Sequence, residues 1–571
     1  MTFLKHDPST FATAAASGFA DVHAELVHVV DGGVVRATRS SQDEVALVIG
    51  GGSGHYPAFA GLVGPGLAHG AVLGNIFASP SAHQVEKVSR MVHQGRGVLL
   101  SYGNYAGDVL QFDAAAERLS ADGIRVKSVR VTDDISSAPL EEKNRRRGIA
   151  GDLVVFKVAG AAAARGDDLD TVFEIASRAN DHTRSLGVAF TGCTLPGADE
   201  PLFTVPAGRM AVGLGIHGEP GLDEVEVPTP AGLAEMLVSR LLSEVPGGGT
   251  HAGRRVVVVV NGLGAVKADE LYVVYGEIKQ QLEAAGVVIA DAKVGEFCTS
   301  FEMAGLSLTL AWLDDELEEL WLAPAHSAEY SVGDTNMGTV AVDTVELVTP
   351  ETPLSTGEAS EESRAFAARI ADALATVAAT VDGHMEELGK IDAVAGDGDH
   401  GIGMHNGARG AAAAASSAAD QGAGAGTLLR RAGEAWSDSA GGTSGALWGM
   451  MLTTLGDAFG DSDTFGLEAL RRGVRAATDK VMTHGGAKVG DKTMVDALSP
   501  FADAITCAEE DDIASVWRLA VDAAQRGAES TRGMLPGLGR ARSHGERARD
   551  VPDPGAISFA LIVAALQQHL R

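Results

Sequence analysis

The sequence predicts a multidomain protein in which an α/β domain with mostly parallel sheets precedes an all-α domain. The chain has 571 residues, too many for one hydrophobic core, and its length fits about three to four ordinary domains or two large ones. Hydrophobic residues make up 45% and charged residues 21%, as in ordinary globular proteins, so wholesale disorder is excluded. The hydrophobic pattern also changes its period partway along the chain, after a polar segment.

Four apolar runs rich in β-branched residues alternate with helical stretches in the first part of the chain. We expect them to be buried strands; they are Val45–Gly50, Gly97–Gly103, Asp152–Val158 and Arg254–Gly262. Continuous apolar strands separated by helices predict an α/β fold with a largely parallel sheet. Ligand sites of such folds gather at the carboxyl ends of the strands, and the first glycine-rich loops of this chain follow those ends.

A polar segment and a change of period divide the chain. Residues 345–364 read VELVTPETPLSTGEASEESR, which cannot bury enough apolar surface to fold, so we expect a linker. Beyond it, apolar residues recur every three or four positions from Phe366 to Leu388, as on one face of a helix. The rest is Ala-rich, and Ala556–Leu570 predicts a last apolar helix. The predicted parts are therefore an α/β domain over 1–344, a linker over 345–364 and a helical domain over 365–571.

The composition excludes several classes of protein. The formal net charge of −31 would repel a nucleic-acid backbone, and no long basic run offsets it. Cys193, Cys298 and Cys507 are far apart and form no metal or disulfide pattern, which favours a reducing cytoplasm. The N-terminus, MTFLKHDPST, lacks the apolar core of a signal peptide, and the apolar run Val256–Val260 is too short to span a bilayer. We therefore expect a cytoplasmic protein without nucleic-acid or membrane partners.

Three aspartates crowd one turn of the predicted helical domain. The segment IDAVAGDGDHGIG, residues 391–403, contains Asp392, Asp397 and Asp399 in D-x4-D-x-D spacing. Carboxylates this close repel one another unless a cation neutralises them, and oxygen-only ligands select Mg²⁺ or Ca²⁺. The segment lacks the glutamate of a calcium-binding EF-hand, so Mg²⁺ shared with substrate phosphates is the better interpretation. A solvated acidic turn is common for one or two aspartates but does not explain three with interleaved glycines.

Three further glycine-rich loops occur in the same domain. Gly441–Gly445 (GGTSG) offers free backbone amides and two hydroxyls ahead of an apolar run, which suits phosphate oxygens at a helix start. Gly485–Met494 and Gly539–Ala556 add lysine, arginine and glycine, and Arg540 could meet a phosphate with its planar fork. Each loop alone is more often a plain turn, but four together indicate a nucleotide site. None matches the P-loop or protein-kinase patterns.

The first domain carries two histidines and a carboxylate on glycine-rich loops. GGGSGHYP (Gly50–Pro57) follows a predicted strand and presents His55, and GNYAGD (Gly103–Asp108) follows another and presents Asp108. GIHGEPG places His217 between glycines, which allow close approach of the backbone to a ligand. Most of the 17 histidines are expected to be ordinary turn residues, but these two, with the carboxylate, suggest acid–base or nucleophilic chemistry.

Taken together, these motifs resemble the dihydroxyacetone kinase family in its single-chain, ATP-using form. The motifs GGGSGH, NY-x-GD, GIHGEPG, GDGDHG, GG-x-SG, GDKTM, GRA and DPGA occur in the family's order. The resemblance covers nearly the whole chain and implies a K-type ketose-binding domain, a linker and an L-type domain that binds ATP and Mg²⁺. It also implies that the L-type domain is an antiparallel eight-helix barrel and that the protein is a homodimer.

The resemblance implies roles for residues of the K-type domain. His217 matches the histidine that attacks the substrate carbonyl and holds the ketose as a covalent hemiaminal, which selects carbonyl compounds over polyols such as glycerol. His55 and Asp108 match residues that bind the substrate hydroxyls and act as acid and base, and Asp108 would take the proton of the attacking hydroxyl. Gly52, Ser53 and Gly54 match the loop that contacts the sugar.

In the L-type domain, Asp392, Asp397 and Asp399 match the Mg²⁺ ligands. The residues that match nucleotide contacts are His400, Gly401, Ile402, Gly403, Thr443, Ser444, Gly485, Met494, Arg540, Asp553, Pro554 and Gly555. Phosphoryl transfer needs positioning and charge neutralisation, which the covalent tether and Mg²⁺ would supply. The expected reaction is ATP-dependent phosphorylation of a terminal hydroxyl of a short-chain ketose.

Two departures from the family pattern leave the sugar open between dihydroxyacetone and a tetrulose such as D- or L-erythrulose. Tyr56 stands where the family's first loop commonly has Glu, and Gly103 stands where it usually has Lys. Loss of a charged pair beside the pocket could make room for a four-carbon sugar.

Other functions share parts of this pattern. A phosphotransferase supplied by a phosphocarrier protein usually has its two domains on separate chains, so the fusion disfavours it. A catalytically silent sugar-binding regulator is disfavoured by the intact histidines and aspartates. A lyase activity that cyclises a flavin nucleotide, known for some family members, would use the same residues.

Overall fold

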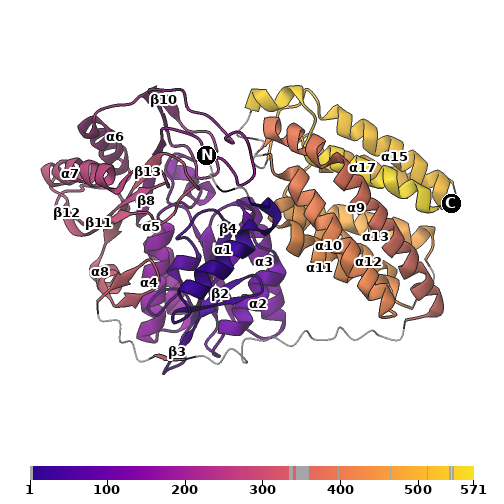
Figure 1. Ribbon diagram of the computed structural model, residues 1–571, viewed down its shortest axis with the longest axis horizontal. Coiled ribbons are helices and arrows are strands. Elements are labelled where there is room, and N and C mark those ends of the chain that lie inside the picture. The colour runs from indigo at the N-terminus through magenta and orange to yellow at the C-terminus, as the bar shows by residue number, and fades with distance from the viewer. Residues whose placement is uncertain are drawn as a thin grey trace. The chain divides into compact units, whose positions relative to one another are not determined.

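The computed structural model describes Leu4 and residues 6–333, 339–341, 359–396, 398–462, 465–510, 512–538, 542 and 545–570. The chain forms two compact units, residues 1–349 and 350–571, which can be followed by colour in Figure 1. Most of the predicted linker, 345–364, lies outside the described residues. The first unit is α/β, and the described elements of the second are all helices, so the predicted fold class is confirmed.

The first sheet of the α/β unit has six strands in the order β1-β2-β5-β4-β6-β7. Its pairings are parallel from β5 to β7 and antiparallel at the β1 side. Helices α2 (Ala82–Val92) and α3 (Ala106–Ala121) cover one face, whereas α4 (Asp152–Arg165) and α5 (Leu169–Asp181) cover the other. The strands are β1 (Val27–Val30), β2 (Gly33–Arg36), β4 (Ala46–Ser53), β5 (Gly70–Ile76), β6 (Val98–Gly103) and β7 (Val126–Val131).

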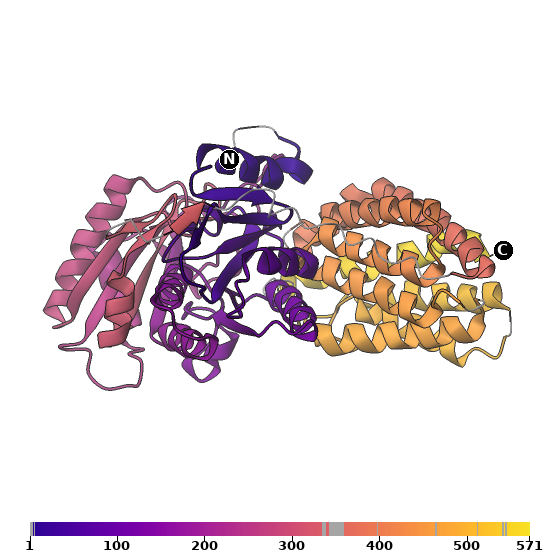
Figure 2. The same ribbon diagram turned by 90° about the horizontal axis from the view of Figure 1, so that it is seen from below.

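The second sheet has the order β10-β9-β8-β13-β11-β12, and only its β11–β12 pairing is parallel. The expectation of mostly parallel sheets therefore applies to the first sheet only, because no helix separates β8 from β9 or β9 from β10. Helices α6 (Pro230–Leu242) and α7 (Ala268–Ala284) pack on one face of this sheet (Figure 2). Its strands are β8 (Thr183–Ala189), β9 (Arg209–Val212), β10 (Asp223–Glu226), β11 (Arg255–Gly262), β12 (Val288–Gly295) and β13 (Gly305–Leu313).

Short elements complete the α/β unit. Helix α1 (Pro8–Val22) packs against the first sheet, and α8 (Asp315–Leu322) packs against α4. Two small antiparallel pairs join β3 (Thr38–Ser40) to β16 (Thr339–Ala341) and β14 (Ala325–His326) to β15 (Ser331–Val332).

The run Asp152–Val158, predicted as a strand, is instead the first half of helix α4. Every residue of α4 from Asp152 to Ala163 is buried, so the helix has no polar face to give it a visible period. A short apolar run cannot distinguish a buried strand from a buried helix. The run continues into the alanines before Arg165, which favour helix, and the helix ends at Gly166 with a φ of +94°. The other three predicted strands correspond to β4, β6 and β11.

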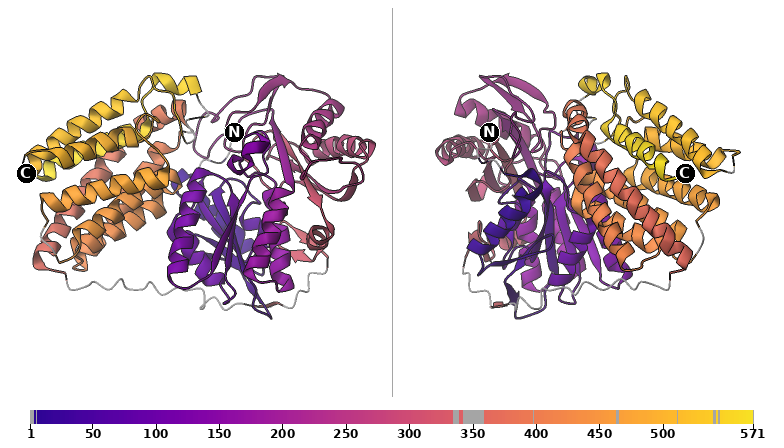
Figure 3. Two further views of the ribbon diagram at one scale, coloured as in Figure 1. Left: turned by 180° about the vertical axis from the view of Figure 1, so that it is seen from behind. Right: turned by 45° about the vertical axis from the view of Figure 1, so that its right-hand side comes forward.

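The second unit is a ring of helices. Each of the eight helices named below packs on the next in sequence, and the last, α17, packs on the first, α9 (Figure 3). Antiparallel neighbours joined by short connections place alternate helix ends at the same edge of the ring. The helices are α9 (Glu361–Ala395), α10 (His400–Asp420), α11 (Ala425–Ala440), α12 (Gly442–Phe459), α13 (Leu467–Gly485), α14 (Val495–Cys507), α15 (Ile513–Ser530) and α17 (Pro554–Leu566).

Helix α9 contains the apolar stripe that the sequence predicted. It begins at Glu361, inside the predicted linker, because the Ser360 side chain caps it by accepting a hydrogen bond from the amide of Ser363. Leu374, Val377, Val381 and Leu388 of the stripe are buried. Helix α9 packs mainly on α10, whose buried residues in the same core are mostly alanines. Among the described residues, no helix combines the length and hydropathy needed to cross a membrane.

Candidate active site

The first group of candidate residues lies at the carboxyl ends of β4 and β6. His55 follows β4, and Asp108 lies in the first turn of α3, just after β6. Because β4 and β6 are parallel neighbours, both loops leave the sheet at the same edge. A Cβ on Gly52 would lie 2.8 Å from the amide nitrogen of Ala78, and Gly54 has a φ of +105°. These two positions therefore require glycine, which explains the GGGSGH motif.

The structure brings His55 and His217 together although 162 residues separate them in sequence. Their Nε2 atoms are 3.0 Å apart, and the other ring nitrogen of His55 lies 2.8 Å from the carbonyl oxygen of Thr299. The ring of Phe77 stacks on His55 with centroids 4.9 Å apart. His55 is 2% exposed. Two imidazoles buried and oriented in this way are placed to act on one small ligand.

The second ring nitrogen of His217 faces a carboxylate. Nδ1 of His217 is 3.0 Å from Oε1 of Glu219, and Oε2 of Glu219 accepts a hydrogen bond from the amide of His217. Burial alone would raise the pKa of Glu219, but the charges of His217 and Arg147 hold it well below its usual range. The ring of Tyr105 packs edge-on against His217, with centroids 4.8 Å apart. His217, the candidate nucleophile, is therefore held by the carboxylate of Glu219 and by two aromatic rings, those of Tyr105 and Phe77.

The partners of the two histidines determine where their protons lie. A carbonyl oxygen and an ionised carboxylate only accept hydrogen bonds, so Nδ1 of His55 and Nδ1 of His217 both carry protons. A contact of 3.0 Å between two nitrogens is a hydrogen bond only if one of them also carries a proton. The pair therefore holds one proton between the Nε2 atoms and has a single positive charge.

Asp108 belongs to a group of buried carboxylates. It is 8% exposed and lies close enough to Asp152 for their charges to interact. Burial, followed by the charges of Asp133 and Asp108, raises the pKa of Asp152 well above its usual value. Ser53, the remaining substrate-loop candidate, donates its hydroxyl hydrogen to the carbonyl oxygen of Gly74. The predicted K-type residues thus gather at one edge of the first sheet.

Sequence reasoning missed several residues of this site. Glu219 lies two residues after His217 in the same glycine-rich motif, so its proximity was available as a signal. Arg147 was not singled out from the run Arg145–Arg147, and no local pattern marks Thr299 or Tyr105 as neighbours of the histidines. These contacts arise from the fold, because they join segments far apart in the chain.

The second group of candidates lies at one edge of the helical ring. Asp392 lies near the end of α9, His400 to Gly403 form the first turn of α10, and Thr443 and Ser444 begin α12. Gly485 ends α13, Met494 precedes α14, and Asp553 to Gly555 begin α17. Amino and carboxyl ends of the helices alternate around the ring, so all the helix ends named above lie at the same edge of the ring.

Hydrogen bonds and charges join several of these residues. The amide of His400 donates to Oδ2 of Asp392 over 3.1 Å, and the His400 ring lies 2.9 Å from the hydroxyl of Ser558 and 3.4 Å from that of Ser444. Burial and the charge of Asp392 raise the pKa of Asp399 to about 7. Burial also raises the pKa of Asp553 to about 7, with the charges of Asp392 and Asp496 adding to it. Anionic groups are crowded here, which is a setting that favours a cation.

The oxygen-rich donor set fits Mg²⁺. Asp392 and Asp399 offer carboxylate oxygens, without the thiolates that softer metals prefer. Asp397 and Arg540, the remaining candidates of the helical unit, lie outside the described residues. Within the described ranges, no group of three or more His, Cys, Asp or Glu side chains could hold a metal ion.

Lys492 and Asp496 were not predicted, yet they shape this edge of the ring. The buried ammonium of Lys492 donates to the carbonyl oxygens of Thr531 and Val551, over 2.8 and 2.6 Å. Asp496 accepts hydrogen bonds from the amides of Gly490 and Thr493. The GDKTM loop is therefore fastened to the segment that leads into Asp553.

The fold and these two sites define a two-unit protein that combines a buried histidine pair in an α/β unit with a carboxylate cluster in a ring of helices. The Dak1 domain matches residues 17–329, and the DAK2 domain matches residues 394–568. The chain therefore belongs to the dihydroxyacetone kinase family.

Relatives of the same length are similar throughout. The chain is 53% identical to an L-erythrulose kinase of Pectobacterium atrosepticum, over all of this chain and 97% of the relative. It is 48% identical to a D-erythrulose kinase of Mycolicibacterium smegmatis, over 98% of this chain and 97% of the relative. Among solved structures, the dihydroxyacetone kinase from C. freundii in complex with AMP-PNP and Mg²⁺ is 30% identical, with a TM-score of 0.53 and 99% of both chains covered.

Proposed function

We propose that this protein is an ATP-dependent kinase that phosphorylates a terminal hydroxyl of a short-chain ketose. The observation that carries the proposal is the buried pair of His55 and His217, whose Nε2 atoms lie 3.0 Å apart beside the substrate loop. Family membership and the full-length similarity to erythrulose kinases support it. The enzyme is a phosphotransferase with an alcohol group as acceptor, and ATP is its co-substrate.

His217 captures the ketose through its carbonyl carbon. The Nε2 lone pair of His217 forms a bond to that carbon while the π bond of the carbonyl breaks. The proton held between the histidines passes from Nε2 of His55 to the carbonyl oxygen, which becomes the hydroxyl of a hemiaminal. The positive charge then resides on the alkylated imidazole of His217, next to the carboxylate of Glu219. Glycerol, which has no carbonyl group, cannot be held in this way.

Asp108 is the proposed base for the transfer step. It takes the proton of the terminal hydroxyl as the hydroxyl oxygen attacks the γ-phosphorus of ATP and the bond to ADP breaks. Gly52, Ser53 and Gly54 line the sugar beside it. Holding the ketose covalently converts an encounter between two substrates into a positioned reaction.

The helical unit is the proposed ATP site. Asp392, Asp397 and Asp399 would hold Mg²⁺, which neutralises charge on the phosphates when bound. Free amides at the start of α12, at Thr443 and Ser444, suit phosphate oxygens. The other proposed nucleotide contacts are His400, Gly401, Ile402, Gly403, Gly485, Met494, Arg540, Asp553, Pro554 and Gly555.

A tetrulose is the proposed sugar. Tyr56 donates a hydrogen bond to Glu329, where a glutamate at position 56 would repel that carboxylate. Gly103 lies against the ring of Tyr105, which in turn packs on His217. The erythrulose kinases similar to this chain support the same choice, and either enantiomer fits these observations. Cytoplasmic location, which the cysteine pattern favours, and homodimerisation, which the family resemblance implies, stay proposals as well.

The deciding experiment measures ADP release from Mg²⁺-ATP with dihydroxyacetone, D-erythrulose, L-erythrulose, glyceraldehyde and glycerol. We expect turnover of a ketose and none of glycerol. His217→Ala should abolish turnover, while His251→Ala, in the loop before β11, should behave as the wild type. Strong activity on dihydroxyacetone with much weaker activity on both erythruloses would refute the tetrulose assignment. No ADP from any of them would favour a phosphocarrier-supplied transferase or a silent regulator.

A further inference from the structure

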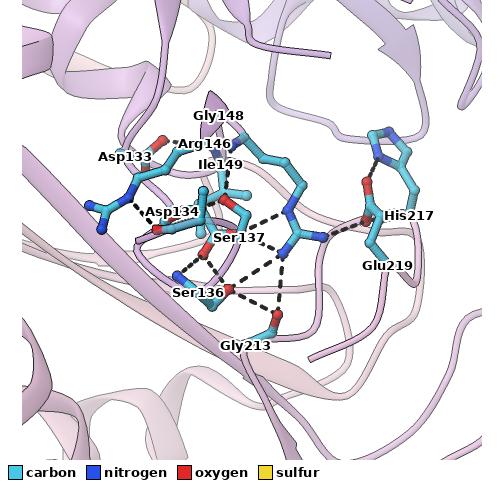
Figure 4. Close-up of polar contacts among 12 residues, drawn as sticks. Asp133, Asp134, Ser136, Ser137, Arg146, Gly148, Ile149, Gly213, His217 and Glu219 are labelled. Atoms are coloured by element: carbon cyan, nitrogen blue, oxygen red, sulfur yellow. Dashed lines mark hydrogen bonds and ion pairs between the residues drawn. The ribbon is translucent and has the colours of Figure 1, made fainter. Parts of the chain in front are cut away.

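His217 is connected through Glu219 to an arginine that no motif of the family pattern above contains. Nη1 of Arg147 lies 3.7 Å from Oε2 of Glu219, whose other oxygen faces Nδ1 of His217. Figure 4 shows Glu219 between His217 and the segment that carries Asp133, Asp134 and Arg146. The side chains of Arg147 and Glu219 are both 13% exposed, so water screens their interaction little.

The guanidinium of Arg147 is held rigidly on its other side. Its Nε and Nη2 atoms donate to Oδ2 of Asp134, over 3.0 and 2.8 Å, and Nη2 also donates to the carbonyl oxygen of Gly213. The remaining oxygen of Asp134 accepts hydrogen bonds from the amide and the hydroxyl of Ser136. Asp134 is 2% exposed. The position of Arg147 is therefore fixed without any contribution from Glu219.

The charges in this chain of contacts balance only while Arg147 is present. Asp134 and Glu219 contribute two negative charges, and Arg147 and the histidine pair contribute one positive charge each. Without the arginine, the histidine would be the only cationic partner of the buried Glu219 carboxylate among the described residues. Such a carboxylate binds an additional proton more tightly, either itself or through the imidazole.

An additional proton would disable His217 when it resides on the imidazole. One proton shared between Glu219 and Nδ1 leaves a lone pair on Nε2. A second proton can go to Oε2 of Glu219 or to Nε2 of His217, because the Glu219–Nδ1 hydrogen bond already holds one, and on Nε2 it removes that lone pair. A protonated Nε2 cannot form a bond to a carbonyl carbon.

We propose that Arg147 is a positioning residue that keeps His217 nucleophilic, by restraining Glu219 from drawing a second proton onto the Glu219–His217 pair. The proposal rests on the proposed ketose capture by His217. It assigns Arg147 no contact with the substrate. As a consequence, the acidic end of the pH range in which the enzyme is active depends on Arg147, a residue outside the reacting groups.

Other ionisable groups face His217, and any that titrate in the measured range would contribute to the pH profile of activity. Burial raises the pKa of Tyr105 well above its usual value and that of Cys193 to about 11, so both remain uncharged near neutrality. Burial raises the pKa of Asp133 to about 6, within the range to be measured. The groups that face His217 directly or through these contacts are His55, Tyr105, Asp133, Asp134, Arg147, Cys193 and Glu219.

The test is the pH dependence of kcat/KM for the preferred ketose, which reports protonation of the free enzyme. In Arg147→Gln, the acid limb should move to higher pH by about one unit, the size expected from losing an adjacent opposite charge. Arg147→Lys keeps the charge and should restore most of the wild-type limb. Glu219→Gln still accepts from Nδ1 but carries no charge, so its limb should move to lower pH.

Arg146→Gln is the matched control. Arg146 is also buried, is adjacent in sequence and makes a two-point ion pair with Glu244, but no contact links it to Glu219. Loss of the Arg146 side chain should lower stability without moving the acid limb. Both Arg146→Gln and the Arg147 variants keep Asp133, so any contribution of Asp133 to the limb is present in all of them. An unmoved limb in folded Arg147→Gln, with activity lower by the same factor at every pH, would overturn the proposal. A wild-type enzyme that turns over no ketose would instead overturn the proposed function.

Discussion

Gly103 shows how one missing side chain shapes the pocket. A Cβ at this position would lie 3.1 Å from the ring of Tyr105, and that ring packs edge-on against His217. A lysine here, as the family pattern usually has, would press Tyr105 toward the histidine and reduce the space for a longer sugar. We expect Gly103→Lys to lower kcat/KM for erythrulose relative to dihydroxyacetone by about tenfold, the usual effect of one misplaced methylene-sized contact. Steady-state kinetics with both ketoses will measure the ratio, and an unchanged ratio would show that position 103 does not select the sugar.

The buried environment of His69 should make the folding stability depend on pH. It is buried against Glu44 and Arg36, and burial together with the charge of Arg36 lowers its pKa to about 4. The unfolded chain takes up a proton at this residue near pH 6.5, but the folded chain does so only near pH 4. Folding stability therefore falls as pH drops between these values, by about 3 kcal/mol at most.

Urea unfolding at pH 7.5, 6 and 5 tests this effect. The wild type should lose stability over that range, and His69→Gln should lose less, because glutamine cannot take up the proton. His251→Gln, in the loop before β11, should follow the wild type. Equal pH dependence in all three proteins would mean that other groups cause the loss.

At the scale of elements, α4 depends on a glycine that allows close packing. A Cβ on Gly160 would lie 2.6 Å from the Cα of Leu67 and 2.7 Å from its carbonyl oxygen, so the backbone would have to move. Gly160→Ala should therefore destabilise the protein by about 1–3 kcal/mol, the cost of overfilling a packed interior. Gly276 in α7 is the control, because a Cβ there meets nothing within 4 Å. Gly276→Ala should stabilise by about 0.5–1 kcal/mol through helix propensity.

Denaturant midpoints of the two variants will show whether they move in opposite directions. A shift of both midpoints in the same direction would contradict the packing argument for α4.

Helices α9 and α4 show which elements can be predicted from the sequence and which cannot. The α9 stripe was predictable because one face is buried and the other is wet, so its period is visible. Helix α4 was mistaken for a strand because it is buried on all sides. Strand direction in the second sheet was equally hidden, since it depends on how β8, β9 and β13 are connected. The glycine-rich loops predicted His55, Asp108 and His217, whereas Arg147 and Lys492 gain their roles only from contacts across the fold.

At the scale of the whole molecule, the two proposed chemistries should be separable. The candidate residues for sugar capture belong to one compact unit and those for nucleotide binding to the other. His217→Ala should lose capture of a carbonyl-labelled ketose, seen in ¹³C spectra as persistence of the free carbonyl signal, yet still bind Mg²⁺-ATP by calorimetry. Asp392→Asn should capture the ketose but bind Mg²⁺-ATP at least about tenfold more weakly, as expected for loss of a charged ligand. Loss of both functions in either folded variant would contradict this division.

The return of α17 to α9 also affects the order in which the protein can mature during synthesis. The histidine pair and its partners belong to the α/β unit, which is made first, and domains generally fold as units from the N-terminus as they emerge. The helical ring cannot close until α17 is available to pack on α9. Under the proposed function, a nascent chain would therefore acquire the residues that hold a reactive carbonyl compound before it could form the proposed site for ATP.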